Sequence, residues 1–95
     1  MSYIKQRMPV DELLAGLAEE CSELSQASLK LRRVLNGQNP TPTPYEEAKE
    51  HFFEEVADVQ LYLKQIDIPW NYIKKIGFSK QKRWEERLNG ESKAT

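Results

Sequence analysis

Two pairs of acidic residues could act together in this sequence, although they lie far apart along the chain. Glu20 is followed by Glu23, and Glu55 is followed by Asp58, so the members of each pair are three residues apart. On an α-helix such residues are neighbours, with roughly 5–6 Å between their β-carbons. Each pair could therefore present two carboxylates from one helix to a shared site.

The apolar residues around these acids predict two amphipathic helices. They recur at steps of three and four, or multiples of these, which is the spacing of one helix face. Glu20 and Glu55 each interrupt such a face, so four carboxylates converge if the two helices pair antiparallel. The predicted apolar seams are Leu13, Leu17, Leu24, Ala27, Leu31 and Val34 in the first helix, and Ala48, Phe52, Val59, Tyr62 and Ile66 in the second.

Carboxylates that are half buried together must take up protons, stay in contact with water or hold a cation. Ligands that are all oxygen favour a hard ion such as Mg²⁺, which keeps part of its water shell and reaches a substrate through phosphate oxygens. The simpler alternative is that the acids form solvated helix faces, because 15 of the 95 residues are acidic. The coincidence of two interrupted seams favours a metal site.

Turn residues give the boundaries of the first two helices. The first is predicted over residues 11–35 and ends at Asn36-Gly37, because both residues tolerate the left-handed conformation that closes helices. Residues 36–44 contain three prolines and form an inter-helix loop. Thr43 is predicted to cap the second helix, with Pro44 at its first helical position and Glu46 completing a capping box. That helix is expected to end near Ile66.

A third helical stretch is predicted from Trp70 to Leu88, with a bend at Gly77. Residues 89–95 have little to bury and are expected to form a frayed tail. We find no strand-like alternation, so residues 1–95 are predicted to be a single all-α domain with three main helices. One such small chain leaves much of its surface open, and we expect a second copy to complete a four-helix-type core.

Charge and cysteine content narrow the function classes and the compartment. A net charge of −1 argues against a general binder of nucleic acid polymers or of membrane surfaces. Cys21 is the one cysteine and cannot form an internal disulfide. The first seven residues lack the apolar run of a signal peptide, and no apolar stretch has transmembrane length. These features predict a cytoplasmic protein.

The acidic pairs also carry a family resemblance. Glu19-Glu20-Cys21-Ser22-Glu23 and Glu54-Glu55-Val56-Ala57-Asp58 resemble the EExxE and ExxD motifs of MazG-like nucleotide pyrophosphohydrolases, which belong to the all-α NTP pyrophosphatases. The surrounding stretches, LAEECSELSQASLKLRR and EEVADVQLYL, resemble the two motif helices of that family. The 31 residues between Glu23 and Glu55 exceed the spacing in many members, and the proline-rich loop accounts for the excess.

This resemblance implies Mg²⁺-dependent hydrolysis of nucleoside triphosphates, non-standard or deoxy, to nucleoside monophosphate and pyrophosphate. It implies that Mn²⁺ could substitute for Mg²⁺ and that the chain forms a homodimer or homotetramer. Glu19, Glu20 and Glu55 would be catalytic, with Glu19 orienting water or binding a second ion. The metal ligands implied by motif position are Glu20, Glu23, Glu55 and Asp58.

Candidate substrate contacts lie in the third helix. Lys80, Arg83 and Arg87 occur at steps of three and four and form a basic stripe that could bind phosphates. This stripe resembles a C-terminal pattern of the family, and its alternative is a solvated basic face. Trp70 and Tyr62 could stack on the base, although aromatic residues at helical spacing also form cores.

Two other function classes are compatible with the sequence. In a non-catalytic helical adaptor or oligomerisation module the acids are surface residues, and Glu55→Gln is neutral or stabilising. In a nucleotide-binding sensor the fold and the metal are kept, but nothing is turned over. The enzyme interpretation predicts that Glu55→Gln abolishes both activity and stabilisation by Mg²⁺.

Overall fold

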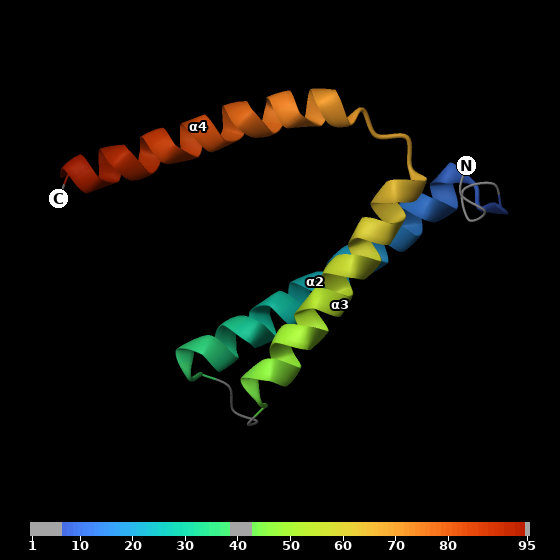
Figure 1. The fold of residues 1–95 in the computed structure, drawn as a ribbon, viewed down its shortest axis with the longest axis horizontal. Coiled ribbons are helices and arrows are strands. Elements are labelled where there is room, and N and C mark those ends of the chain that lie inside the picture. The colour runs from blue at the N-terminus through green and yellow to red at the C-terminus, as the bar shows by residue number, and fades with distance from the viewer. Residues whose placement is uncertain (1–6, 39–42, 95) are drawn as a thin grey trace.

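The computed structural model describes residues 7–38 and 43–94, with side chains up to residue 91, and it is built from helices (Figure 1). Within these ranges it has no strand, which confirms the all-α prediction. None of the described helices combines the length and the apolar character that a membrane span requires. The long helices within the described ranges are α2 (Val10–Asn36), α3 (Tyr45–Gln65) and α4 (Trp70–Ala94).

Helix α2 ends where the sequence predicts. Gly37 is its C-cap, with a φ of 74°, and its N–H donates a hydrogen bond to the carbonyl of Arg33. This left-handed conformation is open to glycine because it lacks a Cβ. Acidic residues lie in the first turn of α2 and Arg33 lies in its last turn, so both ends of the helix carry charges that suit its dipole.

Helix α3 begins one residue later than predicted, and its N-cap is a different residue. The N-cap is Pro44, which has a ψ of 138° and lies outside the helix, so Thr43 is not the cap and Pro44 is not the first helical residue. The carbonyl of Pro44 accepts hydrogen bonds from the N–H groups of Glu47 and Ala48. The chain therefore enters α3 through a backbone carbonyl, with no side-chain cap from Pro44. The central part of the predicted loop, residues 39–42, lies outside the described residues.

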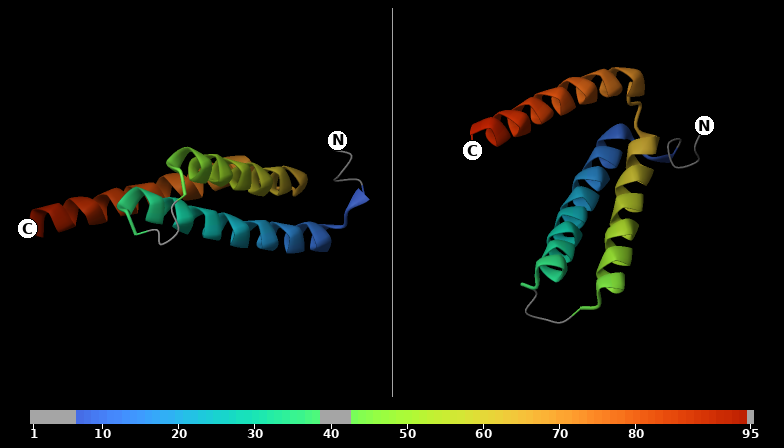
Figure 2. Two further views of the ribbon diagram at one scale, coloured as in Figure 1. Left: turned by 90° about the horizontal axis from the view of Figure 1, so that it is seen from below. Right: turned by 60° about the vertical axis from the view of Figure 1, so that its left-hand side comes forward.

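Helices α2 and α3 pack side by side and antiparallel (Figures 1 and 2). Their buried residues are Leu13, Ala27, Ala48, Glu55 and Gln65, and Leu13 is the large side chain that is fully buried. The predicted apolar seams of both helices are confirmed, because each of their members is buried or half-buried. This pair of helices therefore contains the core of the described chain.

One close contact between the two helices was not predicted. The ring of Tyr62 lies directly over Gly16, where a Cβ would overlap it. A glycine inside a helix costs about 1 kcal/mol relative to alanine. Here it allows an aromatic ring from α3 to approach the backbone of α2.

Helix α4 differs from the prediction in both its shape and its length. It continues through Gly77 without a break and reaches Ala94, although the sequence predicted a bend at Gly77 and a frayed tail over residues 89–95. A single helical glycine costs only about 1 kcal/mol, and the Lys, Gln, Arg and Glu residues that follow favour a helix. Residue 95 lies outside the described chain.

Helix α4 stands apart from the α2–α3 pair (Figure 1; Figure 2, right). The extensive packing between the described helices is that of α2 against α3. Ile76 is half-buried, while the other α4 residues from 70 to 91 are exposed. A single chain thus consists of a packed helical hairpin and a long helix that lacks a packing partner in the described structure.

Candidate metal centre

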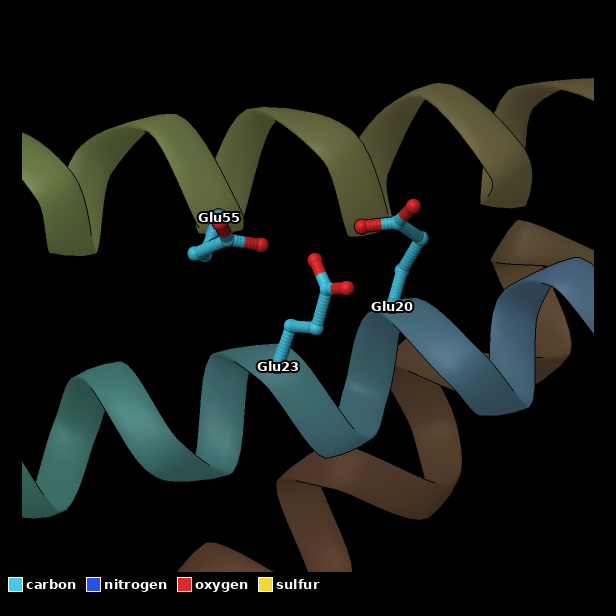
Figure 3. A group of neighbouring side chains, drawn as sticks. All are labelled: Glu20, Glu23 and Glu55. Atoms are coloured by element: carbon cyan, nitrogen blue, oxygen red, sulfur yellow. The ribbon is translucent and has the colours of Figure 1, made fainter.

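The antiparallel packing brings three carboxyl groups together, Glu20 and Glu23 from α2 and Glu55 from α3 (Figure 3). One carboxylate oxygen from each residue lies within 4.8 Å of the other two. The structure therefore gathers three of the four predicted metal ligands from segments that are far apart in sequence. We call these three residues the acidic cluster.

The burial of the acidic cluster follows from the helix seams. Glu20 and Glu55 replace apolar residues on the packed faces, so Glu20 is half-buried and Glu55 is only 8% exposed. Glu23 lies on the adjoining row and is exposed. The cluster is therefore buried on the side of Glu55 and open to solvent on the side of Glu23.

Burial and mutual repulsion disfavour the charged forms of the two inner carboxyl groups. Burial raises the pKa of Glu20, and the nearby charges of Glu23 and Asp58 raise it further. Burial likewise raises the pKa of Glu55, again with the charges of Glu23 and Asp58 adding to the shift. Without a cation, part of the cluster is thus held towards the protonated state.

Two oxygen atoms of the cluster lack partners. The Oε2 atoms of Glu20 and Glu55 are buried and have no hydrogen-bond partner among the described residues. A buried acceptor without a donor is costly, and a bound cation would satisfy it. The donor set consists of carboxylate oxygens, which are the ligands that Mg²⁺, Mn²⁺ and Ca²⁺ prefer. The residues present therefore fit a hard divalent cation.

His51 is a neighbour of the cluster that sequence reasoning missed. Its Nδ1 lies 4.0 Å from Oε1 of Glu55, and its side chain is about half exposed. When protonated it would lower the pKa of Glu55, opposing the effect of burial. The four-residue spacing between His51 and Glu55 could have indicated this proximity, because it places both residues on one helix face. In the described ranges, no lysine or arginine forms an ion pair with the cluster.

Asp58 and Glu19 lie near the cluster but outside it. Both are exposed, and neither belongs to the set of oxygens that lie within 4.8 Å of one another. The charge of Asp58 nevertheless raises the pKa of both Glu20 and Glu55. The charge of Glu19 also raises the pKa of Glu20, as the smallest of the contributions.

The predicted substrate contacts are not brought to the cluster within one chain. Lys80, Arg83 and Arg87 lie on α4, which makes no extensive contact with the hairpin. Together with Trp84 they line an open hollow along that helix. Trp70 is the first residue of α4 and is 50% exposed. Tyr62, the other aromatic candidate, is half-buried and packs over Gly16.

Comparisons with known proteins do not identify this site. No family model matches the chain, and neither a curated protein nor a solved structure does. Its function is therefore inferred from the acidic cluster and from the motif residues that form it.

Proposed function

We propose that the protein is a MazG-like, Mg²⁺-dependent nucleoside triphosphate pyrophosphohydrolase. The observation that carries this proposal is the carboxyl group of Glu55, which is buried with an unpaired oxygen beside Glu20 and Glu23. An adaptor would gain stability by replacing this residue with an apolar one, whereas a metal site requires its oxygen. The motif resemblance then supports a triphosphate as the substrate.

Glu20, Glu23 and Glu55 would hold the metal, and Asp58 is the fourth ligand that the motif implies. Mg²⁺, or Mn²⁺ in its place, would neutralise phosphate charge and lower the pKa of bound water when present. The open side of the cluster, at Glu23, is where a phosphate could approach. Glu55, on the buried side, would give the site a fixed position on α3.

The remaining residues would position water and substrate. Glu19 is exposed beside Glu20, so its carboxylate could accept a hydrogen bond from the attacking water and orient it. The basic stripe would bind phosphate oxygens, and Trp70 would stack on the base. We further propose that the chain acts as a homodimer or homotetramer in the cytoplasm.

Product analysis tests this proposal. Purified protein is incubated with standard, deoxy and modified nucleoside triphosphates, with Mg²⁺ and then with a chelator. We expect monophosphate and pyrophosphate with Mg²⁺ only. Glu55→Gln should abolish the products, whereas Glu50→Gln, which removes the same charge from an exposed position on α3, should retain them.

The rival functions give different results in the same experiment. A sensor would bind triphosphates in a Mg²⁺-dependent way but would release no product. An adaptor would show neither turnover nor any rise in melting temperature with Mg²⁺. Either result would overturn the enzyme proposal.

A further inference from the structure

His51 lies against Glu55, the most buried residue of the acidic cluster. Its Nδ1 is 4.0 Å from Oε1 of Glu55, and its own side chain is half exposed. Glu47 and Glu54 are also helical neighbours of His51, one turn away on either side. Among the described residues, however, the ion-pair contact of His51 is with Glu55. The imidazole ring therefore lies between solvent and the buried carboxyl group.

The two oxygens of Glu55 have different surroundings. Oε1 is the oxygen beside His51, while Oε2 is buried and has no hydrogen-bond partner among the described residues. Figure 3 shows an oxygen of Glu55 pointing toward Glu23 across the helix interface. In metal sites the ligating carboxylates are themselves hydrogen-bonded, which orients them toward the ion. Glu55 fits this division, with His51 beside one oxygen and the cluster open to the other.

The carboxylate plane of a glutamate needs such a partner because its last torsion angle is poorly fixed. Rotation about this bond has broad minima, unlike the staggered torsions that precede it. Ordering a buried glutamate side chain costs up to about 2 kcal/mol in lost rotamer freedom. A neighbour that restricts the rotation beforehand removes part of this cost from the binding of a ligand.

The contact between His51 and Glu55 has room to tighten. A distance of 4.0 Å is about 1 Å longer than an N–H···O hydrogen bond. The ring of His51 turns about a broad terminal torsion, and it borders a hollow of about 500 Å³ that Lys30, Glu47 and Glu54 also line. In the metal-bound state Glu55 is ionised, so its Oε1 is a stronger acceptor and the shorter contact is favoured.

We propose that His51 is a positioning residue for the metal ligand Glu55. Its Nδ1–H donates a hydrogen bond to Oε1 and leaves Oε2 directed to the cation held with Glu20 and Glu23. His51 is not itself a ligand, because its nitrogen atoms lie outside the set of donor atoms that are within 4.8 Å of one another. This inference rests on the proposed function, because it assigns a role within the same metal site.

A purely electrostatic role for His51 would have the opposite effect on metal binding. A positive charge beside the cluster repels a cation, so removing it would strengthen the binding of the ion. Loss of a residue that orients a metal ligand instead weakens binding, by about 10–100-fold. The direction of the change therefore separates the two roles.

A titration with Mn²⁺ tests this inference on the whole chain without requiring turnover. Free Mn²⁺ gives a strong EPR signal that the bound ion loses, so the titration yields a Kd for each variant. The decisive pair is His51→Asn and His51→Leu, which have side chains of similar size. Asparagine carries its N–H donor at the branch position that Nδ1 occupies in histidine, whereas leucine has no donor.

The matched control is Lys49→Ala. It removes the cation of a different ion pair on α3, in which Nζ of Lys49 lies 2.9 Å from Oε2 of the exposed Glu46. Thermal unfolding in the presence of chelator measures the stability of each metal-free variant. Because His51 is half exposed, we expect the Tm of both His51 variants to stay close to that of wild type.

His51→Leu should bind Mn²⁺ at least about tenfold more weakly than wild type. His51→Asn should bind like wild type, because it keeps the donor to Oε1. Lys49→Ala should bind no more weakly than wild type. This pattern would support a positioning role, because the loss follows the donor and not the positive charge.

Two results would overturn the inference while leaving the proposed function intact. One is that His51→Leu binds Mn²⁺ as tightly as wild type or more tightly, which means that His51 does not orient Glu55. The other is an equal loss of affinity in His51→Asn and His51→Leu, which means that the donor is not what the site requires. If wild type binds neither Mn²⁺ nor Mg²⁺, the proposed function fails as well.

Discussion

Helices α2, α3 and α4 each carry apolar residues along one face, but these faces have different environments in the structure. In α2 and α3 the apolar rows meet each other, and the glutamates that interrupt them become buried. In α4 the apolar residues Trp70, Ile73, Trp84 and Leu88 share one face, with Gly77 and Gln81 between Ile73 and Trp84, and this face remains exposed. Sequence spacing therefore shows which face of a helix is apolar, but it does not show what covers that face.

Two glutamates illustrate the same difference. Glu85 on α4 is exposed, and its Oε1 accepts a hydrogen bond of 3.0 Å from Nε2 of Gln81. Glu55 on α3 is buried, with an oxygen that lacks such a donor. Both residues lie in Glu-Glu pairs on long helices. Burial beside other acids distinguishes a candidate metal ligand from a solvated charge.

The mutation with the largest expected effect, Leu13→Ala, tests whether the hairpin contains the core. Leu13→Ala should lower the free energy of unfolding by about 2–5 kcal/mol, because it leaves a cavity at the large side chain that is fully buried. The matched change in α4 is Phe78→Ala, at a residue that is 71% exposed. It should change stability by less than about 0.5 kcal/mol. Urea unfolding followed by circular dichroism measures both values, and similar losses would show that α4 is packed in solution.

The next effect tests the acidic cluster. At a hundredfold excess over its Kd, a bound ion stabilises the folded state by about 2.7 kcal/mol. We expect Mg²⁺ to raise the Tm of wild type and of Glu50→Gln, but not that of Glu55→Gln. Without metal, Glu55→Gln should be at least as stable as wild type, because it removes a buried charge. An equal Mg²⁺ response in all three proteins would show that the ion binds elsewhere.

The hairpin and its cluster could largely be predicted from the sequence. The spacing of the seam residues identified the packed faces of α2 and α3, and Glu20 and Glu55 were identified as interruptions of those faces. This succeeded because the partner of each face lies within the same chain. The left-handed C-cap at Gly37 was predicted for a similar reason, since it depends on local backbone preferences.

Other features depend on contacts that local patterns do not specify. The position of Tyr62 over Gly16 depends on how closely two helices approach, which spacing alone does not determine. The N-cap of α3 is Pro44 and not Thr43, because the backbone at Pro44 is extended. The bend predicted at Gly77 is absent, because the flanking residues favour a continuous helix. The distance between His51 and Glu55 depends on side-chain rotamers, and the exposure of α4 depends on how this helix is placed relative to the hairpin.

Two variants with smaller expected effects compare a glycine of the hairpin, Gly16, with a glycine of α4, Gly77. Gly77→Ala should stabilise the protein by about 0.5–1 kcal/mol, because alanine favours a helix and nothing lies within 4 Å of the new Cβ. Gly16→Ala should instead destabilise it by about 1 kcal/mol, because the new Cβ overlaps the ring of Tyr62. Thermal unfolding of the two variants measures this difference in sign. A gain in both would mean that the ring does not lie over Gly16.

The smallest effect is a pH dependence of the metal-free protein. The pKa values of Glu20 and Glu55 are raised on folding, so the folded state holds protons that the unfolded state releases. The protonated carboxyl groups therefore stabilise the folded state fully when the pH is below the ordinary glutamate pKa of about 4.3. It is lost as the pH rises through the raised values. Glu20→Gln/Glu55→Gln should thus gain a few degrees in Tm over wild type between acidic and neutral pH, in the presence of chelator.

The matched pair in α4 separates this effect from a general loss of charge. Glu85→Gln/Glu86→Gln removes two exposed carboxylates, so its difference from wild type should change little over the same pH range. Added Mg²⁺ should reduce the pH dependence of wild type at neutral pH, because the ion binds the deprotonated cluster and offsets its repulsion. If the two double variants respond to pH alike, the carboxyl groups of the hairpin are as well hydrated as those of α4, and the case for a metal centre at Glu55 is lost.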